Sequence, residues 1–301
     1  MCGINGTIVP EGRADLGAVT AMNRRLRHRG PDEGGAIGLG RVAMGMRRLS
    51  ILDLESGSQP MTTADGRFTI VYNGECYDTA AQRAALEREG ARLRTTTDTE
   101  VVLERWARRG ERSLDALNGM FGFAVHFRVA DSVTLVRDPI GIKPLYYWHG
   151  PKGELVFSSE LASLLEHPSV PRQLDRRSLV ALLVDRSVAD PWTLLDGVHQ
   201  LPPGHLLRWR DGAIEVERYW TYRLAPEPMD EREALEALRA RLDASVRSQL
   251  VADVPVGVFL SGGIDSSTVE DHVARAGEGA GPTRNGRSPR PGKRECRQDR
   301  R

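Results

Sequence analysis

Residues 119–160 constrain the fold of this chain most strongly. The segment contains four short apolar or β-branched runs separated by Gly, Pro and Asp, namely FGFAVHF, SVTLVRD, LYYW and LVFSSE. Runs of this length with turn residues between them are typical of antiparallel strands that pair with their sequence neighbours. The segment therefore favours an α+β domain with stacked sheets over regular βαβ units.

The residues before this segment alternate between helical and strand-like patterns. Apolar residues at helical spacing, together with Gly and Pro breakers, predict helices over residues 14–27, 79–89 and 97–109. Strand-like pieces lie at residues 1–9, 36–46 and 67–72. Thr97 followed by Glu100 is a capping-box pattern, so we expect the third helix to begin there.

The pattern changes again near residue 211. We expect a first domain over 1–210, a linker over 211–230 and the start of a second domain over 231–270. A helix over 231–249 precedes VPVGVFLSGGIDSS, which indicates a buried strand, a glycine turn and a helix start of an α/β domain. Residues 271–301 hold eight Arg, five Gly and three Pro with few bulky apolar side chains, so we expect a disordered tail.

Composition excludes several classes of protein. The net charge of +1 over 301 residues gives no general attraction to nucleic acid or to a membrane surface. No apolar run approaches the roughly 18 residues of a membrane helix, and MCGINGTIVPEG lacks the features of an export signal, so we expect a cytoplasmic protein. Three cysteines without a CxxC pair predict neither a disulfide framework nor a zinc site, and we expect no metal in this first domain.

Cys2 is the first candidate for chemistry. Removal of Met1 would leave a thiol and a weakly basic α-amine in one residue, which suits an N-terminal nucleophile. The structural alternative is a small buried side chain on the first strand.

Three further positions allow a functional and a structural interpretation. Asn73-Gly74 is a strong hairpin signal, but the Asn amide and the Gly N–H are also the donors that an oxyanion hole needs. Arg48 could bind a carboxylate or lie solvated on the surface. Asp98 could receive an ammonium group or simply favour the first turn of its helix.

Ser261-Gly262-Gly263-Ile264-Asp265-Ser266-Ser267 is the sharpest local signal. Backbone N–H groups in such a turn can hold a phosphate at a helix N-terminus. The segment is not a GxxxxGK[ST] loop, and an ordinary strand-to-helix connection remains the alternative.

Taken together, these motifs resemble those of glutamine-hydrolysing asparagine synthetases. The resemblance covers about residues 1–270 and rests on motifs in family-like order: MCGI, RHRGPD, RLSILDL, NGE, TDTE, GMFGFA, RDPIGIKPLYY, LPPGH and SGGIDSS. It implies an N-terminal nucleophile hydrolase fold, a four-layer sandwich with two antiparallel sheets between helices. A nucleotide-binding α/β domain with a pyrophosphate loop would follow.

The resemblance also implies the roles of the site residues. Cys2 would attack the side-chain amide of L-glutamine and form a thioester, while Asn73 and Gly74 hold the oxyanion. Glutamine itself would be bound by the residues Arg48, Leu49, Ile51, Glu75 and Asp98.

For the second domain the resemblance implies ATP with Mg²⁺ and amidation of L-aspartate by the released ammonia. The ATP loop would comprise Leu260, Ser261, Gly262, Gly263, Asp265 and Ser266. Family members are often homodimers, which we carry over as an expectation.

The end of the sequence departs from the family. The family continues for hundreds of residues after the SGG loop, and here the last thirty residues match nothing in it. We expect a truncation or a shifted reading frame after about residue 269, which would leave only the glutaminase half complete. The alternatives are a glutaminase that supplies ammonia to another chain, an inactive remnant, or an enzyme of the same family with another acceptor.

Overall fold

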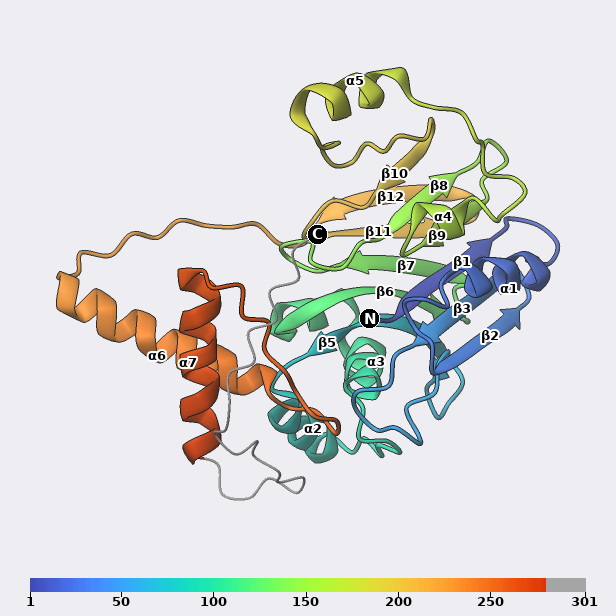
Figure 1. Cartoon of the computed structure of the whole chain (residues 1–301). Coiled ribbons are helices and arrows are strands. Elements are labelled where there is room, and N and C mark those ends of the chain that lie inside the picture. The colour runs from blue at the N-terminus through green and yellow to red at the C-terminus, as the bar shows by residue number, and fades with distance from the viewer. Residues whose placement is uncertain (280–301) are drawn as a thin grey trace. The chain divides into compact units, whose positions relative to one another are not determined.

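The computed structural model describes residues 1–279 and divides the chain into two compact units (Figure 1). The first unit is Met1–Glu227, and the second begins at Pro228.

The first sheet brings the N-terminus of the chain into the middle of the first unit. Its strand order is β10-β8-β9-β1-β3-β2, and all neighbouring strands are antiparallel. The strands are β1 (Gly3–Ile8), β2 (Glu33–Leu39), β3 (Val42–Arg48), β8 (Tyr146–His149), β9 (Leu155–Ser158) and β10 (Val198–Gln200). Every residue of β1 is buried, because β9 and β3 pair with its two edges while α1 and the second sheet cover its two faces. The strand expected at 36–46 is a hairpin of β2 and β3 that turns at Gly40, where φ is +73°.

The second sheet has the order β12-β11-β7-β6-β5-β4 and is also antiparallel throughout. The strands are β4 (Met61–Thr62), β5 (Phe68–Cys76), β6 (Gly119–Phe127), β7 (Ser132–Arg137), β11 (His205–Arg210) and β12 (Ala213–Arg218). The last strand lies inside the segment expected to be a linker. Because β12 pairs with β11 over six residues, the sheet of the first unit continues to Arg218 and does not stop at residue 210.

The helices of the first unit are α1 (Leu16–Arg25), α2 (Thr79–Arg88), α3 (Asp98–Arg109), the 3₁₀ helix η1 (Gly110–Ala116), α4 (Leu161–Leu164) and α5 (Arg176–Asp185). Helices α1 and α4 cover the outer face of the first sheet and α3 covers that of the second, whereas α2 packs on α3 and α5 leaves its apolar side chains exposed. Met22 of α1 and Leu164 of α4 pack on Val156 on the outer face of the first sheet. Trp106 of α3 meets Phe123 of the second sheet edge to face at 5.7 Å. The three helices predicted before residue 110 are thus confirmed.

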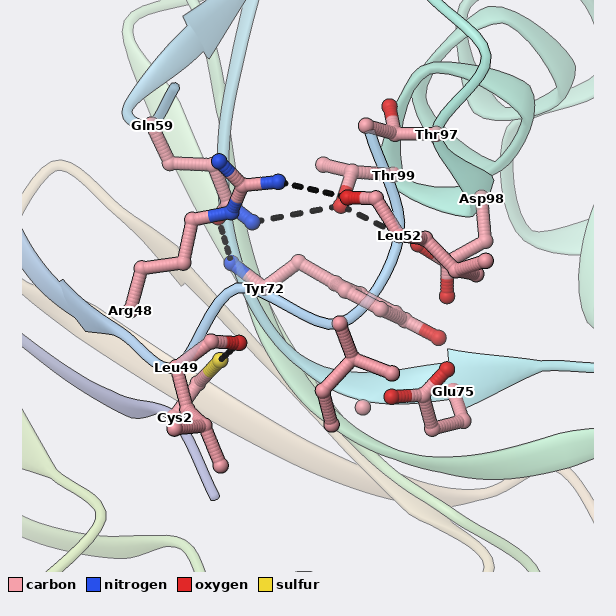
Figure 2. Close-up of a pocket in the computed structure, with 12 residues that line it drawn as sticks. Cys2, Arg48, Leu49, Leu52, Gln59, Tyr72, Glu75, Thr97, Asp98 and Thr99 are labelled. Atoms are coloured by element: carbon pink, nitrogen blue, oxygen red, sulfur yellow. Dashed lines mark hydrogen bonds between the residues drawn. The ribbon is translucent and has the colours of Figure 1, made fainter. Parts of the chain in front are cut away.

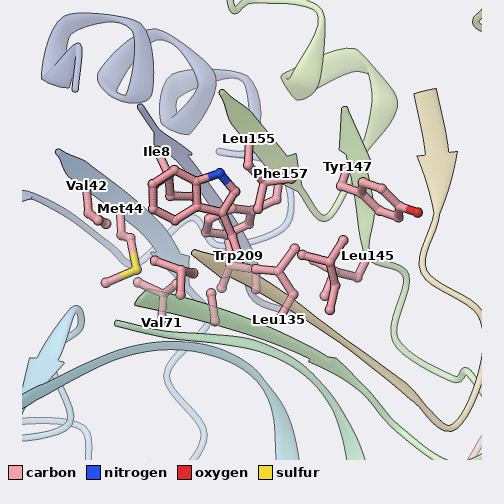
Figure 3. Close-up of a cluster of buried hydrophobic side chains, with 14 of the residues drawn as sticks. Ile8, Val42, Met44, Val71, Leu135, Leu145, Tyr147, Leu155, Phe157 and Trp209 are labelled. Carbon is pink, nitrogen blue, oxygen red and sulfur yellow. The ribbon is translucent and has the colours of Figure 1, made fainter. Parts of the chain in front are cut away.

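The main core lies between the two sheets (Figure 3). Ile8 and Met44 enter it from the first sheet, and Val71, Leu135 and Trp209 enter it from the second. All five side chains are fully buried. This layering confirms the predicted α+β sandwich of two antiparallel sheets between helices.

The second unit contains two helices within the described residues, α6 (Glu231–Gln249) and α7 (Ile264–Gly279). The strand expected from VPVGVFL does not form, and Val256 and Phe259 are 52% and 99% exposed. An isolated apolar segment has no neighbouring strand to satisfy its backbone groups, which a buried strand requires. The tail expected to be disordered from residue 271 is helical up to Gly279, and its remainder, 280–301, lies outside the described residues.

Among residues 1–279, no helix is both long enough and apolar enough to cross a bilayer.

Candidate functional site

Cys2 lies at the entrance to β1. Its side chain is partly buried against the core between the sheets, and its Sγ lies 3.8 Å from the Leu49 carbonyl oxygen. Burial raises the pKa of the thiol, while the contact with Leu49 opposes that rise. A thiol in this state needs a base in order to become a nucleophile.

The backbone around Cys2 is anchored, while Met1 lies at the surface with a contact of 3.9 Å between its sulfur and Arg29 Nη2. Arg29 Nε donates to the Cys2 carbonyl oxygen at 2.8 Å, and the same guanidinium pairs with Glu160 at 3.0 Å. Met1 remains 61% exposed, so an aminopeptidase can reach it. Burial lowers the pKa of the Met1 α-amine, because it disfavours the charged form.

Strand β5 carries Asn73, Gly74 and Glu75. The hairpin interpretation of Asn73-Gly74 is wrong, because both residues lie within the strand and pair with Gly122 and Phe121 of β6. Asn73 and Glu75 share a strand face with Val71, a member of the core between the sheets against which Cys2 also packs. This alternation directs Asn73 and Glu75 toward the layer that contains Cys2.

Two features of this strand suit an oxyanion hole. The Nδ2 of Asn73 is buried and has no hydrogen-bond partner among residues 1–279. A buried amide nitrogen without a partner costs about 1–3 kcal/mol, so such groups call for an explanation. A Cβ at Gly74 would lie 2.6 Å from the Met120 carbonyl oxygen and 2.7 Å from the Tyr72 ring, so only glycine fits there.

Two carboxyl groups lie close to this strand. Burial, together with the nearby Asp98, raises the pKa of Glu75 to about 7. Asp98 begins α3, and its Oδ2 accepts from the Cys76 N–H at 2.9 Å. Burial raises the pKa of Asp98, and that hydrogen bond opposes the rise. A buried acid and a half-buried acid beside each other suit a ligand that brings its own positive charge.

The N-terminus of α3 forms only one half of the expected capping box. Thr97 Oγ1 accepts from the Glu100 N–H at 3.2 Å, as predicted. The Glu100 carboxylate, however, accepts from the N–H groups of Arg94 and Thr95 at 2.9 and 2.7 Å. It therefore fixes the loop before the helix, and Asp98 is held in place by both interactions.

Arg48 ends β3 and is buried beside the loop that follows it. Its Nη2 donates to the carbonyl oxygens of Leu52 and Asp53, both at 2.7 Å, and its Nη1 lies 3.3 Å from Glu33 Oε2. These contacts organise the loop over residues 49–53. A carboxylate ligand would have to share or replace them.

One pocket brings nearly all of these residues together (Figure 2). Of the eight positions predicted for the glutaminase site, seven line it, and Asn73 is buried directly beside them. The pocket residues are Cys2, Arg48, Leu49, Ile51, Leu52, Gln59, Tyr72, Gly74, Glu75, Thr97, Asp98 and Thr99.

Gln59 also lines this pocket, although no sequence motif pointed to it. Its Oε1 accepts from the Tyr72 N–H at 2.7 Å, and its Nε2 donates to Thr99 Oγ1 at 3.2 Å (Figure 2). Gln59 thereby ties β5 to the N-terminus of α3 across the pocket. No local sequence pattern marks such a bridge, since its two partners lie 13 and 40 residues away.

The expected ATP loop lies in the second unit. Ser261 Oγ and Ser266 Oγ are 3.0 Å apart, and α7 begins at Ile264. Gly262 has a φ of +83°, a backbone conformation that glycine adopts without strain. The whole stretch Leu260–Gly263 is exposed. Within residues 1–279 no group of three or more His, Cys, Asp or Glu could hold a metal ion.

Comparison with known proteins places these observations in a family. The model of the family described as "Glutamine amidotransferase domain" matches residues 1–220, and the model described as "Asparagine synthase" matches residues 237–279.

Among curated proteins, the chain is similar to two Bacillus subtilis proteins. It is 33% identical to "Asparagine synthetase [glutamine-hydrolyzing] 3" over 89% of this chain and 44% of the relative. It is 36% identical to "Asparagine synthetase [glutamine-hydrolyzing] 1" over 83% of this chain and 40% of the relative. The chain therefore spans less than half the length of these relatives. "Amidase chyE" of Penicillium rubens is 33% identical over 91% of this chain and 43% of that protein.

Solved structures support the fold. The glutamine phosphoribosylpyrophosphate amidotransferase of B. subtilis superposes with a TM-score of 0.54 at 17% identity, over 92% of this chain and 64% of that one. At this identity the likeness concerns the fold alone, and it agrees with the predicted N-terminal nucleophile hydrolase layering.

Proposed function

The chain belongs to the glutamine amidotransferase domain family, and we propose on that basis that its first unit hydrolyses L-glutamine at Cys2. The observation that carries the proposal is the pocket in which the Cys2 thiol meets Gly74, Glu75 and Asp98.

The proposed reaction begins when Met1 has been removed. The neutral α-amine of Cys2 takes the thiol proton, and the sulfur attacks the side-chain amide carbon of glutamine. The oxyanion that forms accepts hydrogen bonds from Asn73 Nδ2 and the Gly74 N–H. The unpartnered Nδ2 of Asn73 supports this role, because the substrate would supply its missing acceptor.

Collapse of this intermediate breaks the carbon–nitrogen bond. The leaving nitrogen takes the proton from the α-amine, ammonia departs and a glutamyl thioester remains. Water then attacks the thioester and releases glutamate and the Cys2 thiol. In this scheme Arg48 binds the α-carboxylate of glutamine, while Glu75 and Asp98 bind its α-ammonium. Leu49 and Ile51 contribute the pocket wall.

The second unit is proposed to be the beginning of an ATP-dependent synthetase. In the full relatives' reaction as we propose it, ATP with Mg²⁺ would activate the carboxylate of aspartate for attack by ammonia. The residues from Ser261 to Ser266 suit a phosphate, since they combine hydroxyls with the start of a helix of 16 residues. Within residues 1–279 these residues are mostly exposed, and the strand expected before them is not formed.

A different acceptor is a second candidate. The similarity to a protein named as an amidase supports it, because relatives at equal identity carry different names. An ammonia-supplying glutaminase and an inactive remnant also remain as alternatives. The domain limits, a homodimer and a cytoplasmic location stay predictions.

Glutamate release from glutamine by the purified chain tests the proposal. The assay contains neither ATP nor aspartate, and mass spectrometry first establishes that Met1 is absent. We expect release by the wild type and by Cys76→Ala, which removes the other thiol of the first unit, and none by Cys2→Ala. Release by Cys2→Ala would refute the nucleophile. No release by a folded, processed wild type would favour the inactive remnant.

A further inference from the structure

Lys143 belongs to the loop between β7 and β8, and its backbone is held from two directions. The Asp138 carboxylate accepts from the N–H groups of Ile142 and Lys143, both at 2.9 Å. Arg137 Nε donates to the Lys143 carbonyl oxygen at 3.0 Å. Both clamping residues are themselves buried, at 5% exposure or less. The loop therefore presents Lys143 in a fixed position.

The side chain of Lys143 is 5% exposed, and it has no partner that explains its burial. Within residues 1–279, its nitrogen forms no ion pair and no hydrogen bond, and that nitrogen keeps a little accessible surface. Lys152, the other lysine in this part of the chain, is exposed. Burying an ammonium group without an ion pair is costly, so a position of this kind points to a task.

Strand register shows where this side chain lies. A Cβ built on Gly122 would be 3.7 Å from Lys143 Cβ. Gly122 of β6 pairs with Asn73 of β5, and paired residues of antiparallel strands project from the same face of a sheet. Lys143 therefore lies over the face that carries Asn73 and Glu75. Burial lowers the pKa of its ammonium group, and Glu75 and then Cys2 are the groups that most oppose this.

We infer that Lys143 is a positioning residue of the glutaminase site, whose ammonium lies over the strand face that carries Glu75 and favours the carboxylate form that binds the α-ammonium of glutamine. The inference rests on the proposed function of the pocket. Because the two groups are not in contact as an ion pair, the oxygens of Glu75 stay available for the substrate.

The other charged and titratable groups around Glu75 do not replace Lys143. Asp98 of α3 disfavours the Glu75 carboxylate, and Cys2, Tyr72 and Tyr77 carry no positive charge. The α-amine of Met1 is the other cation that favours the carboxylate, and it is absent once Met1 has been removed. The α-amine of Cys2 starts the proposed reaction neutral and becomes positive only when it takes the thiol proton. Lys143 is then the cation beside Glu75 when glutamine binds, before the thiol proton moves.

The test replaces Lys143 in the full chain and follows Glu75 in two ways. Lys143→Met keeps the aliphatic stem, Lys143→Arg keeps the charge, and Lys152→Met removes a surface lysine as the matched control. Carboxyl ¹³C NMR follows the titration of Glu75, with Glu75→Gln to assign the resonance. Glutaminase kinetics from pH 6 to 9 give kcat and KM separately.

We expect the Glu75 titration to move to higher pH in Lys143→Met, because a nearby positive charge favours the carboxylate. A move of about one pH unit from a midpoint near 7 would raise KM about fivefold at pH 7 and less than twofold at pH 9. The value of kcat should change little. Lys143→Arg should restore the wild-type profile, and Lys152→Met should match the wild type throughout.

An unchanged Glu75 titration in folded Lys143→Met would overturn the inference, as would a loss confined to kcat. If that variant does not fold, Lys143→Gln is measured in its place with the same expectations. A wild type that releases no glutamate would refute the proposed function, and the NMR titration would still decide whether Lys143 controls Glu75.

Discussion

Replacement of Asn73 by alanine separates a catalytic from a structural role for the buried amide. The side chain occupies the face of β5 that looks toward Cys2, yet its Nδ2 has no hydrogen-bond partner within residues 1–279. In the proposed reaction this nitrogen acquires a partner only when the oxyanion forms. Asn73→Ala should therefore lower activity strongly and leave stability almost unchanged.

The magnitudes follow from these contacts. Loss of one oxyanion donor lowers kcat by about 10²–10³-fold, or about 3–4 kcal/mol in the activation barrier. In the folded protein, alanine removes an unsatisfied amide that costs about 1–3 kcal/mol and leaves a small cavity of opposite effect. The two terms offset each other, so we expect the free energy of unfolding to change by less than about 1 kcal/mol.

Asn23→Ala is the matched control. This asparagine is also buried in the first unit, but its Nδ2 donates to the carbonyl oxygens of Gly35 and Met46, both at 3.1 Å, and its Oδ1 accepts from Asn5. Its replacement leaves buried carbonyl groups unpaired and should cost about 2–4 kcal/mol of stability. Under conditions where it remains folded, it should retain activity.

Denaturant unfolding followed by tryptophan fluorescence, beside glutamate release under saturating glutamine, measures both effects. All five tryptophans lie between residues 106 and 220, so the signal reports the first unit. If Asn73→Ala keeps kcat within fivefold of the wild type, the amide is not an oxyanion donor. A loss of stability as large as that of Asn23→Ala would show that it has a structural role instead.

Three further predictions address the charges and the second unit. The pKa of Glu75 is raised in the folded state from 4.5 to about 7, so the folded state binds the proton more tightly than the unfolded state. The free energy of unfolding should therefore fall by up to about 3 kcal/mol as pH rises from about 4.5 to 7. Glu75→Gln should remove this fall in fluorescence-monitored unfolding, and an equal fall in the variant would contradict the assignment. Arg48→Lys should raise KM for glutamine at least tenfold with a smaller change in kcat, since lysine lacks the guanidinium fork that would bind the α-carboxylate of glutamine. Steady-state kinetics would show an unchanged KM if Arg48 only supports the loop through its bonds to Leu52 and Asp53. A chain that ends at Glu227 should be more soluble than the full chain, because it lacks the exposed apolar segment around Val256 and Phe259. It should still release glutamate, because the pocket lies within the first unit. Equal solubility by ultracentrifugation would refute the explanation by the apolar segment.

Local sequence patterns were sufficient for elements whose stabilising contacts are themselves local. The helix that begins after Thr97 could be predicted because its cap bonds a backbone group three residues away. The short strands of residues 119–160 could be predicted because each pairs with a sequence neighbour. The identity of the site residues came from the resemblance, and the comparisons support the family on which it rests.

The tertiary structure decided those positions whose partners lie far away in the sequence. Asn73-Gly74 has a hairpin preference, but burial of a nine-residue strand between β4 and β6 outweighs it. The apolar run near Val256 has the pattern of a buried strand, but a strand needs neighbours, and the described chain offers none there. Gln59 and Lys143 reach the site only through contacts across the fold. The sequence by itself determined which side chains are present and where helices begin, whereas the packing of two sheets determined which of those side chains meet, because burial and charge depend on neighbours that no local pattern specifies.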